Sequence, residues 1–367
     1  MSTKAAKRIR VLVVDDSRTQ RDLLTHVLSS EPDIELAAIV EGGQAALDYL
    51  AGADPRPDVA LMDIHMPQLD GFETTRRIME SQPLPIVICT ATADPQELAI
   101  AFRAMEAGAV ACIEKPRSPT DADYGPCIRH LLQTVRLMSE VKVVRRWPRP
   151  RPTLTTVPAV QAAAADTVRF IGIGASTGGP PVLQTILGGL PKSFPVPILI
   201  VQHIARGFLP GMVDWLNQTT GLKIRIASHG IVAEPGHAYI APDDFHLAAT
   251  ASGRILLARE PAENGLRPSV SYLFRSLAHS CGAGAIGVLL TGMGKDGAQE
   301  LKLMKDRGAL TIAQDRESSI VHGMPGEAIA IDATVQILPA DRIADALVIH
   351  VKRKAATAAG QEPWASP

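Results

Sequence analysis

The sequence predicts an α/β protein with two domains in series, each built around a mostly parallel sheet. Short apolar runs recur along residues 10–144 and again after residue 167, and segments of helix length separate them. This alternation is typical of βαβ units, whose strands are covered by helices on both faces. A chain of 367 residues, 46% of them hydrophobic, also exceeds the roughly 250–300 residues at which one core stops growing. Two cores are therefore expected.

Polar side chains follow the strands expected in the first domain. Three apolar runs end in polar residues: RVLVVDD in Asp15 and Asp16, PDVALMDI at Asp63, and LPIVICTAT at Thr90. Lys115 follows the next predicted strand, in IEKP. Because the carboxyl ends of parallel strands meet at one edge of a sheet, these side chains are expected to converge. Three carboxylates in one place repel one another, and Mg²⁺ with oxygen ligands is the usual way to keep them ionised together. The alternative is that each acid only caps the helix that follows it.

Together with LMDIHMPQLDG and IEKP, this set makes residues 10–130 resemble the receiver domain of two-component response regulators. The resemblance implies a flavodoxin-like fold with a five-stranded parallel sheet. It also implies that a histidine kinase phosphorylates Asp63. The Mg²⁺ ion would be held by Asp15, Asp16 and Asp63, with the backbone carbonyl of His65 as a further ligand.

The resemblance assigns the signalling switch of the receiver to two further residues, Thr90 and Lys115. A hydroxyl and a lysine point charge at these positions would bind the phosphoryl oxygens. Three residues before the lysine, receivers usually have Tyr or Phe, whereas this chain has Cys112. We therefore expect the coupling between Thr90 and that side chain to differ in this protein, without an effect on phosphorylation itself.

A segment rich in Pro, Arg and Ala separates the two domains. Residues 142–166 contain four prolines and five basic residues, with no acid before the last position. Proline removes backbone donors and restricts φ, so this segment is expected to be an extended linker. The predicted division is a receiver over 1–130, a linker over 131–167 that includes the last receiver helix, a second domain over 168–355, and a tail over 356–367.

The second domain is predicted to be a doubly wound, mostly parallel α/β sheet. Its strands are expected in VRFIGIG, VPILIVQH, AIGVLLTG and ALTIAQD. Between the second and third of these, the segment from KIRIASHG to RILLARE reads as short strands around turns. This pattern predicts an antiparallel hairpin inserted at the edge of the sheet. In open sheets of this kind, chemistry gathers at the carboxyl ends of the strands.

The stretch GIGASTGGP, residues 172–180, is either a phosphate cradle for a dinucleotide or a turn that presents Ser176 as a nucleophile. The dinucleotide fingerprint needs a third glycine where this chain has Thr177. It also needs an acid at the end of the next strand, which here ends in Gln and His. Residues 174–178 match G-x-S-x-G, the nucleophile elbow of hydrolases. The sequence therefore favours the nucleophile.

Ser176, His203 and Asp296 each follow a predicted strand and can form a catalytic triad. Neighbouring strands lie about 4.8 Å apart, so a hydroxyl and an imidazole at the ends of two such strands can meet. A carboxylate after a third strand can hold the imidazole tautomer and stabilise its charged form. Each residue also has a plain structural interpretation, a helix cap for the serine and the acid and an ordinary partner for the histidine. Five other histidines are rival bases: His229, His237, His246, His279 and His322.

Six motifs make the second domain resemble the catalytic domain of chemotaxis protein-glutamate methylesterases, the CheB family. They are IGIGASTGG, VQHIARGFLPGM, AYIAPDDFHL, RPSVSYLFRS, AIGVLLTGMGKDGA and TIAQDRESSIVHGMP. The resemblance implies Ser176 as nucleophile, His203 as general base and Asp296 as its orienting acid. Thr177 lies beside the nucleophile, and the loop of Met293 would contribute a backbone donor to the oxyanion.

The combined resemblance implies a phosphorylation-regulated serine hydrolase. It would demethylate glutamate methyl esters on methyl-accepting chemotaxis receptors and deamidate selected receptor glutamines. A chemotaxis-type histidine kinase would be the phosphodonor, the unphosphorylated receiver would cover the active site, and no cofactor is expected for the ester chemistry. The alternative is a receiver-controlled, non-catalytic scaffold that binds receptor helices. Three departures from the family bear on substrate docking and domain contacts: Ile204-Ala205 in place of Met-Pro, Ser271 in place of an acid, and Gly326 in place of a basic residue.

Composition excludes several other classes of protein. A net charge of −1 gives no global attraction to nucleic acid or to an anionic membrane, and the second half has no recognition-helix pattern. The chain has no apolar run of about 18 residues and no apolar leader, which predicts a cytoplasmic protein that is recruited to its receptors and not inserted in the membrane. The four cysteines have neither zinc-ligand nor disulfide-framework spacing.

Overall fold

The computed structural model places the chain in two compact units, Met1–Arg146 and Trp147–Pro367. It describes residues 8–90, 95–116, 120–121, 124–141, 143 and 167–358, with only the backbone of 95–99 and 358. Most of the predicted linker and the end of the predicted tail lie outside the described residues. None of the described helices combines the length and the apolar composition that a membrane span requires.

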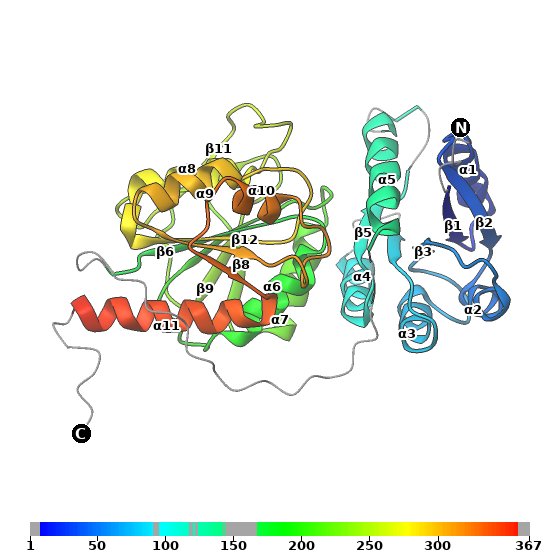
Figure 1. The fold of residues 1–367 in the computed structure, drawn as a ribbon, viewed down its shortest axis with the longest axis horizontal. Coiled ribbons are helices and arrows are strands. Elements are labelled where there is room, and N and C mark those ends of the chain that lie inside the picture. The colour runs from blue at the N-terminus through cyan, green and yellow to red at the C-terminus, as the bar shows by residue number, and fades with distance from the viewer. Residues whose placement is uncertain are drawn as a thin grey trace, which may run out of the picture. The chain divides into compact units, whose positions relative to one another are not determined.

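The first unit is a five-stranded parallel sheet in the order β2-β1-β3-β4-β5 (Figure 1). Its strands are β1 (Ile9–Val14), β2 (Ile34–Val40), β3 (Val59–Asp63), β4 (Ile86–Thr90) and β5 (Ala111–Glu114). Every residue of β3 and β4 is buried, which explains why these strands read as unbroken apolar runs. The predicted five-stranded parallel sheet is confirmed.

Helices cover both faces of this sheet, with α1 and α5 on one side and α2, α3 and α4 on the other (Figure 1). The helices are α1 (Arg18–Ser29), α2 (Gly43–Gly52), α3 (Gly71–Ser81), α4 (Pro95–Ala107) and α5 (Tyr124–Ser139). Ser17 caps α1 and Asp70 caps α3, each accepting a backbone N–H of the first turn. The last helix begins before residue 130 and so crosses the boundary predicted there.

The second unit contains a seven-stranded sheet in the order β14-β13-β12-β6-β7-β9-β8, with all pairs parallel. Its strands are β6 (Phe170–Ala175), β7 (Ile198–Gln202), β8 (Lys223–Ile226), β9 (His237–Ile240), β12 (Ala285–Leu289), β13 (Leu310–Gln314) and β14 (Gln336–Leu338). Within this unit the chain starts at the central strand β6 and adds β7, β8 and β9 on one side of it. It then returns to β12, which lies on the other side of β6. The switch point of this doubly wound sheet therefore lies between β6 and β12.

The antiparallel pair predicted in this unit is present as β10 (His246–Ala249) and β11 (Ile255–Ala258). It differs from the prediction in its place, because β10 and β11 form a separate two-stranded sheet and do not join the edge of the large one. The pair packs on α8. There the Ser276 hydroxyl accepts the N–H of Ala249 at 3.0 Å and donates to the carbonyl of Ala249 at 3.1 Å. Strands β8 and β9, from the same stretch of sequence, join the large sheet in parallel and form no hairpin with each other.

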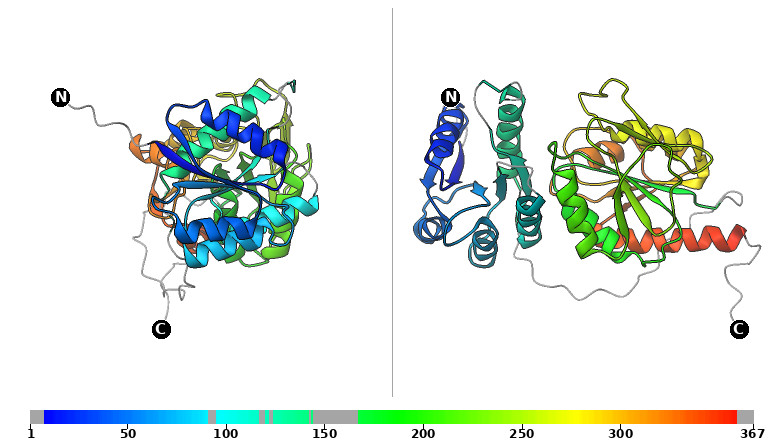
Figure 2. Two further views of the ribbon diagram at one scale, coloured as in Figure 1. Left: turned by 90° about the vertical axis from the view of Figure 1, so that its right-hand side faces the viewer. Right: turned by 180° about the vertical axis from the view of Figure 1, so that it is seen from behind.

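Two groups of helices cover the large sheet, α8, α9 and α10 on one face and α6, α7 and α11 on the other (Figures 1 and 2). They are α6 (Gly179–Gly189), α7 (Leu209–Thr219), α8 (Val270–Ser280), α9 (Ala298–Asp306), α10 (Met324–Ala330) and α11 (Ala340–Ala358), with a short 3₁₀ turn, η1 (Gly282–Gly284). The helices leave the carboxyl ends of β6, β7 and β12 at one edge, where their loops carry the candidate residues.

Candidate functional site

The turn after β6 lies between the ends of its two neighbouring strands. Ala175 is in register with Gln202 of β7, so Ser176 and His203 are the next residues on adjacent strands. The N–H of His203 donates to the Ala175 carbonyl at 2.9 Å, and the N–H of Ser176 donates to the Thr291 carbonyl beyond β12 at 3.0 Å. Both side chains are only partly buried. The sheet thus brings the two predicted residues to one edge.

Glycines allow the loops to approach one another so closely. Gly178 has φ +77°, a conformation that favours glycine, and a Cβ there would lie 2.6 Å from Ile320. A Cβ on Gly292 would lie 2.7 Å from the Cβ of Ser176 and 3.2 Å from its backbone nitrogen. The loop after β12 therefore packs directly on the serine because it has no side chain at that point.

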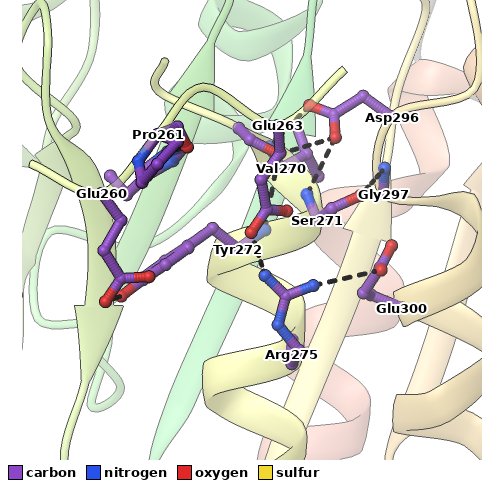
Figure 3. Close-up of polar contacts among 12 residues, drawn as sticks. Glu260, Pro261, Glu263, Val270, Ser271, Tyr272, Arg275, Asp296, Gly297 and Glu300 are labelled. Carbon is purple, nitrogen blue, oxygen red and sulfur yellow. Dashed lines mark hydrogen bonds and ion pairs between the residues drawn. The ribbon is translucent and has the colours of Figure 1, made fainter. Parts of the chain in front are cut away.

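Asp296 is held by the first turn of α8 (Figure 3). The Ser269 hydroxyl donates to Oδ1 at 2.8 Å, the Val270 N–H donates to Oδ2 at 2.7 Å, and the Ser271 N–H donates to Oδ1 at 3.1 Å. The side chain is almost fully buried. Free N–H groups and the dipole at a helix N-terminus make a binding site for an anion, and here the anion is a side chain of the same protein.

The same carboxylate contacts His203. Its Oδ2 lies 3.0 Å from Nε2 of the ring, although the contact is not aligned as a hydrogen bond. Burial by itself raises the pKa of Asp296, but the contacts with His203, Val270 and Ser269 outweigh burial and lower the pKa to about 2. Asp296 is therefore ionised at neutral pH. Because Nε2 faces this carboxylate, Nδ1 is the ring nitrogen that remains for Ser176.

Two backbone amides near the serine are free to bind an oxyanion. The N–H groups of Thr177 and Met293 make no hydrogen bond within the part of the chain that the structure describes. Both residues are partly exposed. The hydroxyl of Thr291 donates to the Thr177 carbonyl at 3.0 Å, which joins the turn of the serine to the loop after β12. Preorganised donors of this kind can stabilise the charge that develops on a carbonyl oxygen during acyl transfer.

The rival histidines have other partners. Their ring nitrogens contact the backbone at Leu257, Pro235, Pro261 and Arg275 or the Ser319 hydroxyl, and none contacts Asp296 among the described residues. The five are His229, His237, His246, His279 and His322. The geometry therefore selects His203 as the histidine of this site.

Three aspartates of the first unit meet at the carboxyl ends of its strands. One oxygen from each of Asp15, Asp16 and Asp63 lies within 4.8 Å of the others. Lys115 reaches the same point, with Nζ 2.7 Å from Asp15 and 2.8 Å from Asp63. Three carboxylate oxygens at this spacing fit a hard divalent cation such as Mg²⁺. Thr90 ends the strand beside that of Asp63 and is fully buried.

Burial and charge act in opposite directions on the ionisable groups of this pocket. Burial raises the pKa of Asp63 more than the Lys115 ammonium lowers it. Burial alone lowers the pKa of Lys115, but the two carboxylates raise it above its ordinary value, so the lysine stays charged. Burial also raises the pKa of Cys112 to about 12, which keeps this thiol neutral at the position where receivers usually have an aromatic ring.

Each of the two units matches a known protein family. A family model for the response regulator receiver domain matches residues 11–122, and one for CheB methylesterase matches residues 171–347. The chain is 50% identical over 347 residues to protein-glutamate methylesterase/protein-glutamine glutaminase 1 of Syntrophus aciditrophicus, covering 93% of this chain and 97% of that protein. A protein of this name from Nitrosospira multiformis is 48% identical over 96% of this chain and 99% of its own length.

The chain belongs to the protein-glutamate methylesterase/protein-glutamine glutaminase family. This membership confirms the predicted family and enzyme class, a carboxylic ester hydrolase joined to a receiver domain. It does not favour the alternative of a non-catalytic scaffold.

Two of the departures from the methylesterase family have a local structural role. The Ser271 hydroxyl accepts the N–H of Gly297 at 2.9 Å and so fixes the peptide that follows Asp296 (Figure 3). A Cβ on Gly326 would lie 2.9 Å from the His322 ring, which occupies the space beside it. The structure gives no reason for Ile204-Ala205.

Thr291 and Gln314 are among the polar residues that support the candidate site without having been predicted. Thr291 is fully buried, and its N–H donates to the side-chain oxygen of Gln314 at 2.8 Å. The amide nitrogen of Gln314 in turn donates to the Ser318 carbonyl. Each of the two ends or follows a predicted strand, in AIGVLLTG and ALTIAQD, so the same strand-end rule that selected His203 could have found them.

Proposed function

We propose that this protein hydrolyses γ-glutamyl methyl esters on methyl-accepting chemotaxis receptors, with Ser176 as the nucleophile, and deamidates selected receptor glutamines. The proposal rests on one observation above all, the presence of Ser176 and the paired His203 and Asp296 side chains at the ends of neighbouring strands. The names of the curated relatives support the choice of substrate.

In the reaction, the Ser176 hydroxyl attacks the ester carbonyl while His203 accepts its proton. Asp296 keeps the ring oriented and stabilises the imidazolium. The N–H groups of Thr177 and Met293 donate to the oxyanion. The imidazolium then returns the proton to the leaving methoxide, and methanol departs. Water attacks the acyl-enzyme by the same route and regenerates glutamate, and for a glutamine side chain the leaving group is ammonia.

The nucleophile is tested by methanol release from methylated receptors in membrane vesicles. Ser176→Ala removes the attacking oxygen, so we expect release to fall to the uncatalysed level while the thermal midpoint changes little. Ser228→Ala, a change of the same kind at an exposed serine in the same unit, should keep full activity. Undiminished release by Ser176→Ala would refute the assignment.

For the first unit, we propose phosphorylation of Asp63 by a chemotaxis-type histidine kinase. Asp15, Asp16 and Asp63 would hold Mg²⁺ with the carbonyl of His65, and the metal would neutralise charge on the phosphoryl group. Lys115 would bind one phosphoryl oxygen in place of one of its present carboxylate contacts, and the Thr90 hydroxyl would bind a second phosphoryl oxygen. We further propose that the unphosphorylated receiver restrains the esterase, that the chain works in the cytoplasm, and that the second domain begins near residue 167. The limits predicted at 130 and 355 fall inside α5 and α11.

A further inference from the structure

Gln202 connects the backbones of the two residues on which the proposed reaction depends. It is the last residue of β7, and only 3% of it is exposed. Its Nε2 donates to the carbonyl of Ser176 and to the carbonyl of His203, each at 2.8 Å. One amide group thus joins the turn after β6 to the turn after β7.

The contacts leave only one orientation for this amide. Turning it over would place Oε1 against two carbonyl oxygens, which repel it. In the observed orientation Oε1 has no hydrogen-bond partner among the described residues and faces the start of α6. The helix N-terminus favours the negative end of the amide dipole there, although Pro180 and Pro181 provide no N–H. A Cβ on Gly179 would lie 2.1 Å from Oε1, so glycine leaves the room that the amide occupies.

The His203 carbonyl depends on the Gln202 amide for its hydrogen bond more than the Ser176 carbonyl does. The Ser176 carbonyl also accepts the N–H of Gly179 at 2.8 Å. The His203 carbonyl has only Gln202 as a hydrogen-bond donor among the described residues. The Asp296 carboxylate lies beside the ring of His203, 3.0 Å from Nε2. The N–H of His203 also joins the two turns at their start, because it donates to the Ala175 carbonyl. Beyond that bond, the spacing between the serine oxygen and the ring depends on the Gln202 amide.

We propose that Gln202 is a positioning residue for hydrolysis, because its carboxamide sets the spacing between the turns of Ser176 and His203. The proposal rests on the catalytic roles proposed for these two residues. A misplacement of about 1 Å between reacting groups can cost about a hundredfold in rate. Substrate binding does not involve the buried amide, so the effect belongs to kcat and not to KM.

The test compares Gln202→Leu and Gln202→Glu with the wild type in the full-length protein. Leucine fills nearly the same volume without donors, and we expect kcat to fall by about ten- to a hundredfold with KM within about twofold. The rate at which a fluorophosphonate probe labels Ser176 should fall in parallel. Glutamate lacks a donor when ionised and regains one O–H when protonated, so its activity relative to the wild type should rise as the pH is lowered. A purely structural role would change the amount of folded protein with pH but not the rate per folded protein.

The matched control is Asn217→Leu. The Asn217 amide also joins backbone segments, donating to Val213 and Ile224 and accepting from Ile224, but between α7 and β8. We expect a lower thermal midpoint and an unchanged labelling rate for the folded protein.

Two outcomes separate this inference from the proposed function. If Ser176→Ala is inactive and Gln202→Leu keeps the wild-type kcat and labelling rate, the inference is wrong and the function stands. If Ser176→Ala is active, both the inference and the proposed function are wrong. Should Gln202→Leu fail to fold, Gly179→Ala displaces the amide from the other side while the amide remains. It should lower kcat with KM unchanged, and a normal kcat in that variant would overturn the proposal.

Discussion

Asp296 shows how a single residue can be buried and still carry a charge. Burial in an apolar core disfavours the ionised form, and the carboxylate remains ionised only because three donors from the start of α8 and the His203 ring surround it. With so many contacts the side chain cannot turn away from His203. An orienting acid needs this fixed position more than it needs basicity.

The lowered pKa of Asp296 makes a prediction about stability. Its pKa is about 2 in the folded state against an ordinary 3.8, a difference of about 2 kcal/mol. Because the folded value is the lower one, this stabilisation is present above pH 4 and is lost as the pH falls toward 2. Asp296→Asn has no such titration. In urea unfolding of both proteins, the free energy of the wild type should fall by about 2 kcal/mol more than that of the variant between pH 4 and pH 2. Parallel curves would contradict the role of these contacts.

At the scale of elements, the site depends on the order of the strands in the large sheet. β12 pairs with β6 although more than a hundred residues separate them, and this pairing brings the loop of Thr291, Gly292 and Met293 onto Ser176. β7 brings His203 from the other side. A doubly wound sheet creates such a meeting at its switch point, because the loops on the two sides of that point diverge and leave a crevice.

Gly292→Ala tests the packing of this loop. The backbone of Gly292 is not in the left-handed region, so the cost of a side chain comes from its contacts with Met324 and Ser176. We expect kcat for methanol release to fall at least tenfold, on the order of the effect of a misplaced reacting group. Gly188→Ala in α6, where the nearest atom would be 4.0 Å away, should keep full activity. Wild-type activity in Gly292→Ala would mean that the loop position does not matter.

At the scale of the whole molecule, the chain joins a charged pocket that can accept a phosphoryl group to a unit that can hydrolyse esters. In the first pocket Lys115 pairs with Asp15 and Asp63 at the same time. A phosphoryl group on Asp63 would compete for this lysine. Regulation between the two units is therefore expected to begin at this ion pair.

Asp63→Asn tests this regulation. The variant should keep the basal rate of methanol release, because the change lies outside the esterase unit. It should not respond to acetyl phosphate with Mg²⁺, whereas the wild type should become faster. Asp48→Asn, at an exposed acid of α2, is the control and should respond like the wild type. A normal response of Asp63→Asn would exclude phosphorylation at this residue as the signal.

The sequence was sufficient to predict much of the fold and the candidate residues. Strand ends were recognisable in RVLVVDD, VALMD and VPILIVQH because a buried parallel strand needs an unbroken apolar run, which stops where polar side chains begin. Gln202 ends such a run as clearly as His203 does, but its role was missed. An amide acquires a role only from the two carbonyls it bonds, and these come from its place beside β6.

Local periodicity and composition are enough to specify the fold class, the two-domain order and the residue types available at each strand end. Three features come from the three-dimensional packing: β10 and β11 form their own sheet, the first turn of α8 surrounds Asp296, and Gln202 joins Ser176 to His203. These features depend on which strands and loops become neighbours. That choice is made by the packing of the whole sheet, and no local pattern of residues encodes it.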